Sequence, residues 1–440
     1  MHILCKNLYQ FVLKLLLNNK IIKLNQYRYL SVFFSFNMLE SLCEVIMKKI
    51  ELLSPAGDLE RLKVTLLYGA DAVYIGGKNY SLRANANNFS IKEIKDACLF
   101  AHNLNKKVYL TLNIVFHNED IDGVEDYIKD VVDAGIDAFI VSDPFIISYI
   151  KSNFSNVEVH LSTQASTTNI ESCKYFKQEG VDRIVLAREL SKKEIKEIIE
   201  EVGIDTEVFI HGAMCTFYSG RCVLSNYVTN RDSNRGGCAQ VCRFAFDNDK
   251  SHNKFTIATK DLNMANYIKD LIDIGVTSLK VEGRMRSLYY LATVIGTYRK
   301  IIDAYYEKKL TKEFIEKQQK ILDRVANRVT STHYFTKKAD ENDQYYTGRQ
   351  ELSNQDFLGI ILGYNKETKI LTLTQRNYFE IGDKVVLFTP SGLEYYFEID
   401  NVKDQDLHDI NVARHPEEII NIHIDLDYDY EEYSMLRKNN

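Results

Sequence analysis

The sequence predicts an α/β fold, a (β/α)8 TIM-like barrel with a Cys-rich insertion after its seventh strand, followed by a small all-β C-terminal domain. Three observations lead to this prediction. Short β-rich apolar runs alternate with amphipathic helical stretches, and eight such units occupy about 240 residues, the usual size of such a barrel. Glycines end several helices, and beyond about residue 350 the pattern changes to short alternating strands. A doubly wound open sheet is the alternative topology.

The eight predicted strands begin shortly after Met47, which opens MKKIELLSPAGD and resembles a natural start. The strands are IELLSP at 50–55, AVYIGG at 72–77, VYLTLN at 108–113, AFIVSD at 138–143, VEVHLS at 157–162, RIVLAR at 183–188, EVFIHG at 207–212 and SLKVEG at 278–283. We therefore assign residues 47–330 to the barrel and leave residues 1–46 as an extension of uncertain status.

Two further regions follow the eighth strand. Ser287 to Asn327 has helical periodicity with Lys and Arg on its polar face, which is typical of a solvated surface. Residues 350–440 contain the predicted strands FLGIILGYN, KILTLTQ, DKVVLFTP, EYYFEID, INVAR and NIHIDLDY, separated by turn residues. Residues 351–440 carry 8 basic and 18 acidic residues, a net charge of -10. We expect this domain to contact a protein partner or to act as a spacer, and its deletion to leave the metal site intact.

Charge and hydropathy exclude two classes of protein. The formal net charge is -6, and residues 1–350 carry only +4, so the chain lacks the basic character of a protein that coats nucleic acid. Any RNA contact would have to be local. Before Met47 the longest uncharged stretch, Tyr29 to Leu39, is much shorter than the roughly 20 residues of a membrane span. No secretory signal is evident, so we predict a cytoplasmic protein without a membrane partner, in which disulfides are not expected.

Polar residues collect where the predicted strands end, and in a barrel these positions form the active-site rim. They are Ser54, Asp58, Asn113, Ser142, Asp143, His160, Ser162, Gln164, Arg188, His211, Lys280, Glu282 and Arg284. Ser54, Asp58 and Asp143 fit equally well as turn or helix-cap residues. His211 fits a proton shuttle or a hydrogen-bonded histidine at the strand end.

The connection between the seventh and eighth strands, residues 213–277, is too long for one helix, and we call it the Cys-rich insertion. It places Cys215, Cys222, Cys238 and Cys242 in the pattern C-x6-C-x15-C-x3-C. Thiolates suit zinc or an iron–sulfur cluster, and four unrelated buried cysteines are the plain alternative. Structural zinc usually has two close cysteine pairs, and only the second pair here is close, so the spacing favours a cluster without excluding zinc.

The surroundings of the cysteines favour thiolate ligands. Four arginines against one aspartate give the segment 211–244 a net charge of +3, which stabilises thiolates and an anionic cluster. They are Arg221, Arg231, Arg235 and Arg243.

The stretch EVFIHGAMC at 207–215, followed by GRCVLS at 220–225, resembles the signature of the peptidase U32 family. The resemblance extends to LLSPAGD at 52–58, YSLRANANNF at 80–89, TKDLNM at 259–264, KVEGRMRSLYY at 280–290 and the C-terminal β-domain. Length and domain order look most like the tRNA 5-hydroxyuridine hydroxylation proteins of that family. One departure is VTSTHYFTKKADEND after Asn327 and Arg328, where the family usually has an aromatic and glycine segment.

The resemblance implies an iron–sulfur cluster of the 4Fe-4S type held by the four cysteines, and prephenate-dependent 5-hydroxylation of the wobble uridine of tRNA. Prephenate bears two carboxylates, for which arginine forks are the natural clamps. Arg83, Arg188 and Arg284 are the candidate clamps, with Lys280 as a point charge, although each also fits a structural ion pair. His211 and Glu282 are the candidate catalytic groups.

Three alternatives stay open. One is a U32-type (collagenase-like) peptidase, although the sequence has neither an H-E-x-x-H helix nor a G-x-S-x-G elbow. Another is hydroxylation of a 23S rRNA cytidine. The third is a zinc-stabilised RNA-binding module, which accounts for the cysteines but not for the polar rim. Analysis of the bound metal separates the zinc module from the hydroxylase.

Overall fold

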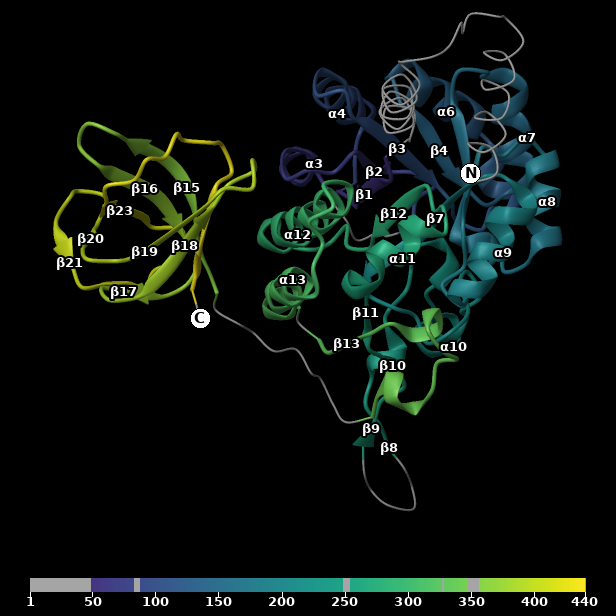
Figure 1. Cartoon of the computed structure of the whole chain (residues 1–440). Coiled ribbons are helices and arrows are strands. Elements are labelled where there is room, and N and C mark those ends of the chain that lie inside the picture. The colour runs from purple at the N-terminus through teal and green to yellow at the C-terminus, as the bar shows by residue number, and fades with distance from the viewer. Residues whose placement is uncertain (1–48, 83–87, 248–253, 327, 347–355, 440) are drawn as a thin grey trace, which may run out of the picture. The chain divides into compact units, whose positions relative to one another are not determined.

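The first large domain of the computed structural model is a closed barrel of eight parallel strands (Figure 1). The structure describes residues 49–82, 88–247, 254–326, 328–346 and 356–439. The barrel strands are β1 Glu51–Pro55, β2 Ala72–Gly76, β3 Lys107–Leu112, β4 Ala138–Val141, β5 Glu158–Leu161, β6 Arg183–Val185, β7 Asp205–Gly212 and β12 Ser278–Val281. β12 pairs in parallel with both β1 and β7, which closes the barrel and confirms the predicted barrel.

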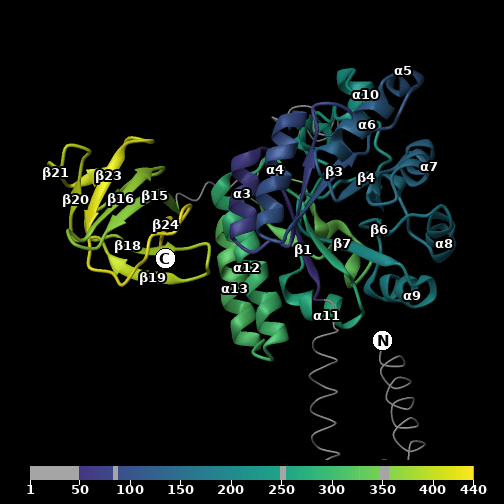
Figure 2. The same cartoon turned by 90° about the horizontal axis from the view of Figure 1, so that it is seen from above.

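Helices cover the outside of the strands (Figure 2). They are α3 Leu59–Leu67, α4 Ile91–Asn103, α5 Asn118–Ile121, α6 Val124–Asp133, α7 Pro144–Asn153, α8 Ile170–Gln178, α9 Lys192–Val202, α11 Ile268–Asp273, α12 Leu288–Tyr306 and α13 Lys312–Val325. Their ends follow from local sequence. Ser191 caps α9 in a capping box with Glu194, and Gly203 ends that helix with φ of 60°.

The barrel interior contains a layer of buried charged side chains. Arg183 donates to Glu51 at 2.6 Å and to Glu207 at 3.2 Å, and Lys280 donates to Glu207 at 2.7 Å. Burial disfavours the charge on Glu207, but Lys280 and Arg183 together outweigh it and lower the pKa of that carboxyl. Opposite charges therefore neutralise one another inside the barrel.

The stretch after β12 corrects one prediction. It forms two helices, α12 and α13, which separate near Lys308, a residue with φ of 59°. Most of α12 is buried rather than solvated. Phe388 and Met435 of the C-terminal domain belong to the same core, and Tyr289 of α12 stacks on Phe357 with ring centroids 4.7 Å apart. A solvated surface was therefore the wrong prediction for α12, because α3, α11 and α13 pack against it and the C-terminal domain covers its Tyr289.

The C-terminal domain is all-β, as predicted, with a core of its own. Its main sheet contains β15 Phe357–Asn365, β16 Ile370–Gln375, β18 Lys384–Phe388, β19 Glu394–Glu398, β20 Val402–Lys403, β21 Asp409–Ile410, β23 Ile419–His423 and β24 Met435–Lys438. The strand order is β19-β18-β24-β15-β16-β23-β20-β21, with antiparallel pairing. β17 Phe379–Glu380 and β22 Val412–Ala413 form a separate pair. β24, which the sequence analysis did not predict, lies in the middle of the main sheet.

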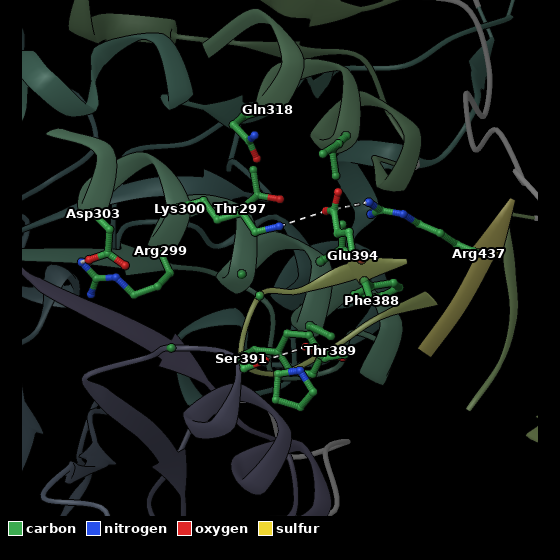
Figure 3. A pocket seen from close by; sticks show the side chains of 18 residues that line it. Thr297, Arg299, Lys300, Asp303, Gln318, Phe388, Thr389, Ser391, Glu394 and Arg437 are labelled. Atoms are coloured by element: carbon green, nitrogen blue, oxygen red, sulfur yellow. Dashed lines mark hydrogen bonds and ion pairs between the residues drawn. The ribbon is translucent and has the colours of Figure 1, made fainter. Parts of the chain in front are cut away.

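A cavity of about 130 Å³ lies where α12 and α13 meet the C-terminal domain (Figure 3). Lys300 and Arg437 both point at Glu394, at 2.9 Å and 3.3 Å. One buried polar atom at this cavity, Gln318 Oε1, has no hydrogen-bond partner among the residues that the structure describes. No cysteine and no residue of the barrel rim lines the cavity, so it belongs to the junction of the two domains.

Candidate active site at the barrel mouth

The Cys-rich insertion lies over the carboxyl ends of several barrel strands. Besides α11 at its end and three short 3-10 turns, its described elements are α10 Leu224–Thr229, β8 Phe246–Asp247, β9 Lys254–Phe255, β10 Ala258–Thr259 and β11 Asp261–Asn263. Beyond β3, Val115 N–H donates to the Asn234 carbonyl at 3.0 Å. Beyond β6, Ser219 N–H donates to Glu189 at 2.9 Å. The insertion therefore crosses the end of the barrel at which active sites of this fold are found.

Gly220 allows the insertion to pass closely over the end of β5. Its φ is +72°, and a Cβ atom at this position would lie 2.2 Å from the Gln164 carbonyl oxygen. A side chain would therefore meet both backbone strain and a clash. Cys222 follows this glycine by two residues in the GRC sequence.

The four predicted ligand cysteines form no disulfide within the described residues, and they are partly or fully exposed. Burial raises the pKa of the Cys242 thiol, whereas Arg243 lowers it. Cys215 and Cys238 raise it further, because they lie close enough for their charges to repel that of Cys242. Within the described part of the chain, no three His, Cys, Asp or Glu side chains are arranged to hold a single metal ion.

Hydrogen bonds hold the cysteine-bearing turns together. Asn234 Nδ2 donates to the Cys222 carbonyl at 3.0 Å, and Ala239 N–H donates to Ser225 Oγ at 3.1 Å. These two bonds link the turn that carries Cys222 to the turn that carries Cys238. Four thiols in one fixed segment are a donor set that fits an iron–sulfur cluster.

Asp261 of β11 lies among three arginines beside the cysteine turns. Arg286 and Arg328 each lie 3.2 Å from its carboxylate, and Arg243 lies 3.8 Å away. One carboxylate among three guanidinium groups leaves a local positive charge. Such a charge stabilises thiolates and bound anions near Cys242. Asp261 was not among the predicted site residues, although it lies in the TKDLNM stretch.

Two predicted site residues meet at the rim. Arg188 Nη2 lies 3.8 Å from Glu282 Oε2, and the Tyr74 hydroxyl donates to the same oxygen at 3.3 Å. Arg188 Nη1 donates to the Ala213 carbonyl at 2.8 Å, which ties the rim to the first residue of the insertion. The Arg188 guanidinium also lies over the Phe209 ring, 3.9 Å from its centroid. The structure thus brings Arg188 and Glu282 together directly beside the cysteine segment.

The remaining predicted substrate-binding residues lie in other environments. Arg284 is buried, and its Nη1 donates to Ser81 Oγ at 3.0 Å. Lys280 points into the barrel and pairs with Glu207. Arg83 lies outside the described residues. A substrate contact by any of these three stays a prediction.

His211 is enclosed in the protein rather than open to the mouth. It is 2% exposed, and its Nδ1 lies 3.1 Å from the Tyr298 hydroxyl of α12. The pairing register of β7 and β12 shifts between Lys280 and Val281, next to His211. Burial lowers the pKa of His211 to about 4, so the imidazole is neutral at neutral pH. Its catalytic role also stays a prediction.

Comparison with known proteins identifies related families and chains. Residues 57–345 match peptidase family U32, and residues 353–437 match the C-terminal domain of that family. The chain is 45% identical to tRNA hydroxylation protein P1 of Bacillus subtilis over 397 residues, covering 87% of this chain and 93% of that protein.

Two more distant relatives have other names. A 23S rRNA 5-hydroxycytidine synthase of Escherichia coli is 37% identical over 59% of this chain and 40% of that protein. A collagenase of Porphyromonas gingivalis is 31% identical over 78% of this chain and 87% of that protein. No helix in the described ranges is long and apolar enough to cross a membrane.

Proposed function

The chain belongs to the peptidase U32 family, and we propose that it is an RNA-hydroxylating enzyme that modifies tRNA. The names of its relatives support this proposal, because the relative with 45% identity and several others are tRNA hydroxylation proteins. We further propose that the product is the 5-hydroxylated wobble uridine, that prephenate is the co-substrate and that the reaction takes place in the cytoplasm.

One structural observation carries the proposal. The segment with Cys215, Cys222, Cys238 and Cys242 crosses the barrel mouth and contacts Arg188, which faces Glu282. A cluster held there would lie beside a cationic side chain and a carboxylate that reach the rim. A cluster of this kind supplies electron transfer or Lewis acidity when bound.

The residues of this chain have distinct proposed tasks. Arg188 would give up its 3.8 Å contact with Glu282 and bind a carboxylate of the co-substrate instead. A guanidinium binds a carboxylate through two parallel hydrogen bonds. Glu282 would then be released to accept a proton near the rim. The positive charge around Asp261 would stabilise the thiolates and the anionic co-substrate.

A peptidase is the second candidate, and the collagenase relative favours it. A cysteine protease needs a thiol activated by a nearby base. His211 is the histidine nearest to the cysteines in the sequence. It is buried against α12, and its Nδ1 forms a hydrogen bond with the Tyr298 hydroxyl. The proposal therefore assigns the thiols to ligation rather than to nucleophilic attack. A 23S rRNA cytidine is the alternative substrate.

Two measurements test the proposal together. Nucleosides from tRNA and rRNA of a strain that lacks this gene are analysed by mass spectrometry, and the expected result is loss of one hydroxylated uridine from tRNA alone. Protein purified without oxygen is analysed for iron, sulfide and zinc, and iron with sulfide is expected. An unchanged nucleoside profile would refute the hydroxylase, and zinc in place of iron would refute the cluster.

A further inference from the structure

The Cys-rich insertion displays an unusual number of exposed large apolar side chains. Within residues 217–244 they are Phe217, Tyr218, Val223, Tyr227, Val228 and Phe244. Tyr227 is 86% exposed and Tyr218 is 63% exposed. Soluble proteins seldom concentrate such side chains on one surface unless a ligand or partner covers them.

The arginines of the insertion divide into two pairs. Arg235 bonds to Asp120 and Arg243 faces Asp261, so both are used within the protein. Arg221 and Arg231 are exposed, and no residue that the structure describes forms an ion pair with either one. The exposed aromatic side chains are therefore accompanied by outward positive charge.

This combination favours single-stranded nucleic acid over a protein partner. Unpaired bases stack on tyrosine and phenylalanine rings, and arginines beside the rings bind the adjacent phosphates. The residues before the C-terminal domain carry a net charge of only +4, so this patch supplies the local contact that the overall charge does not.

Tyr227 also has a rigid support. It lies on α10, where Ser225 is buried and accepts a hydrogen bond from Ala239 N–H at 3.1 Å. Thr229 Oγ1 donates to the Ser225 carbonyl at 2.8 Å. A ring on a fixed helix loses little conformational entropy when a base stacks on it.

We propose that Tyr218 and Tyr227 stack on unpaired bases of an RNA loop, while Arg221 and Arg231 bind the phosphates between them. The inference rests on the proposed function and adds the surface by which the RNA is held. Enzymes that act on a base take it out of its stack, and contacts to flanking nucleotides then hold the remaining loop. Cys215 and Cys238 are exposed on the same segment, so a loop held there would lie next to the reaction site.

The test measures the affinity of an unmodified, fluorescently labelled anticodon stem-loop RNA by anisotropy, with the metal-loaded protein. Tyr218→Ala and Tyr227→Ala are each expected to weaken binding roughly 5- to 100-fold, the range that loss of one base–ring stack produces. Tyr227→Phe should bind like the unaltered protein, because it keeps the ring. Tyr175→Ala is the matched control, since Tyr175 is a 52% exposed tyrosine on α8.

A fully paired RNA duplex should bind all of these proteins equally. Arg231→Ala should weaken loop binding and reduce its dependence on salt. Equal iron content in each variant shows that the site is intact.

The inference is wrong if both alanine variants bind the loop as tightly as the unaltered protein. It is also wrong if they lose hydroxylation in cells while RNA affinity stays unchanged, a result that would indicate a protein partner at this surface. Failure of the proposed function is a different outcome, in which the unaltered protein itself modifies no RNA.

Discussion

Inside the barrel the charged side chains are buried and paired with one another, whereas on the insertion across its mouth two arginines and several aromatic rings face outward. Glu207 lies between Lys280 and Arg183 and is fully enclosed. Tyr227 and Arg231, by contrast, are exposed. Charged side chains therefore have two different roles in this molecule. The interior satisfies its charges for stability, and the mouth leaves side chains available for ligands.

Substitution of the cysteines is expected to give the largest difference between the interior and the insertion. Cys98 and Cys173 are buried, whereas the four cysteines on the insertion are partly or fully exposed. Cys222→Ser and Cys238→Ser should each abolish cluster binding and reduce hydroxylation to background, since a cluster needs all of its thiolates. Iron analysis and nucleoside mass spectrometry measure the effect.

The control for this prediction is Cys173→Ser. Burial raises the pKa of Cys173 to about 11, so it is a poor ligand, and iron content should be unchanged. Full iron in Cys222→Ser or Cys238→Ser would contradict a four-cysteine site.

Glu207→Gln tests the claim that the interior charges serve stability. The change leaves Arg183 and Lys280 without their shared carboxylate, and breaking a buried pair in this way costs about 3–5 kcal/mol. Urea unfolding measures the loss. Glu197→Gln, which removes an exposed helical partner of Lys193, should have little effect. Equal stability of the two variants would remove the distinction between interior and surface charges.

The effect of acid on stability tests His211, which is buried although it lies four residues before the exposed Cys215 in the sequence. Burial holds the pKa of His211 at about 4, against 6.5 for a free imidazole. The unfolded chain therefore takes up a proton first as the pH falls, and stability present above pH 6.5 is lost as the pH approaches 4, by roughly 3 kcal/mol.

His160 and His333 are also buried with lowered pKa values, so they act in the same direction. Unfolding of the His211→Asn variant should consequently depend less on pH between 6.5 and 4, although it should not become independent of pH. An unchanged slope in this variant would show that His211 is not the main group.

The domain junction gives the smallest expected effect. Glu394 accepts from Lys300 and Arg437, and Glu394→Gln leaves these cations close together with only a neutral partner. We expect a loss of about 1–3 kcal/mol, because the site is largely but not fully enclosed. Thermal unfolding measures it, with the exposed Glu398→Gln as the control. A loss as large as that of Glu207→Gln would mean that the junction matters as much as the barrel interior.

Sequence periodicity predicted the barrel because the parallel strands are short apolar runs between helical stretches, and several of them follow a helix-ending glycine. The same reasoning failed where tertiary contacts decide the outcome. Nothing in the sequence of α12 indicates that Phe357 and Phe388 will cover Tyr289. Likewise, the short and basic MLRK run of β24 has little strand character until β15 and β18 pair with it.

The candidate site was predictable in its residue types and less so in its geometry. The cysteine spacing and the polar strand ends selected Arg188 and Glu282, which the structure brings together. Lys280 was chosen as a rim cation, but its position in β12 faces Glu207 within the barrel. Asp261 was not predicted as a site residue because the three arginines that it contacts come from separate parts of the sequence.

Closure of the barrel by β12 has a consequence for folding kinetics. Ser278 of this strand bonds to Glu51 across a sequence separation of 227 residues, so the final pairing must wait for a large loop to be ordered. Until then the seven earlier strands have two open edges, at β1 and β7, which can pair with another chain. The four cysteines lie in the connection between β7 and β12, so binding of the proposed cluster before closure would shorten that connection.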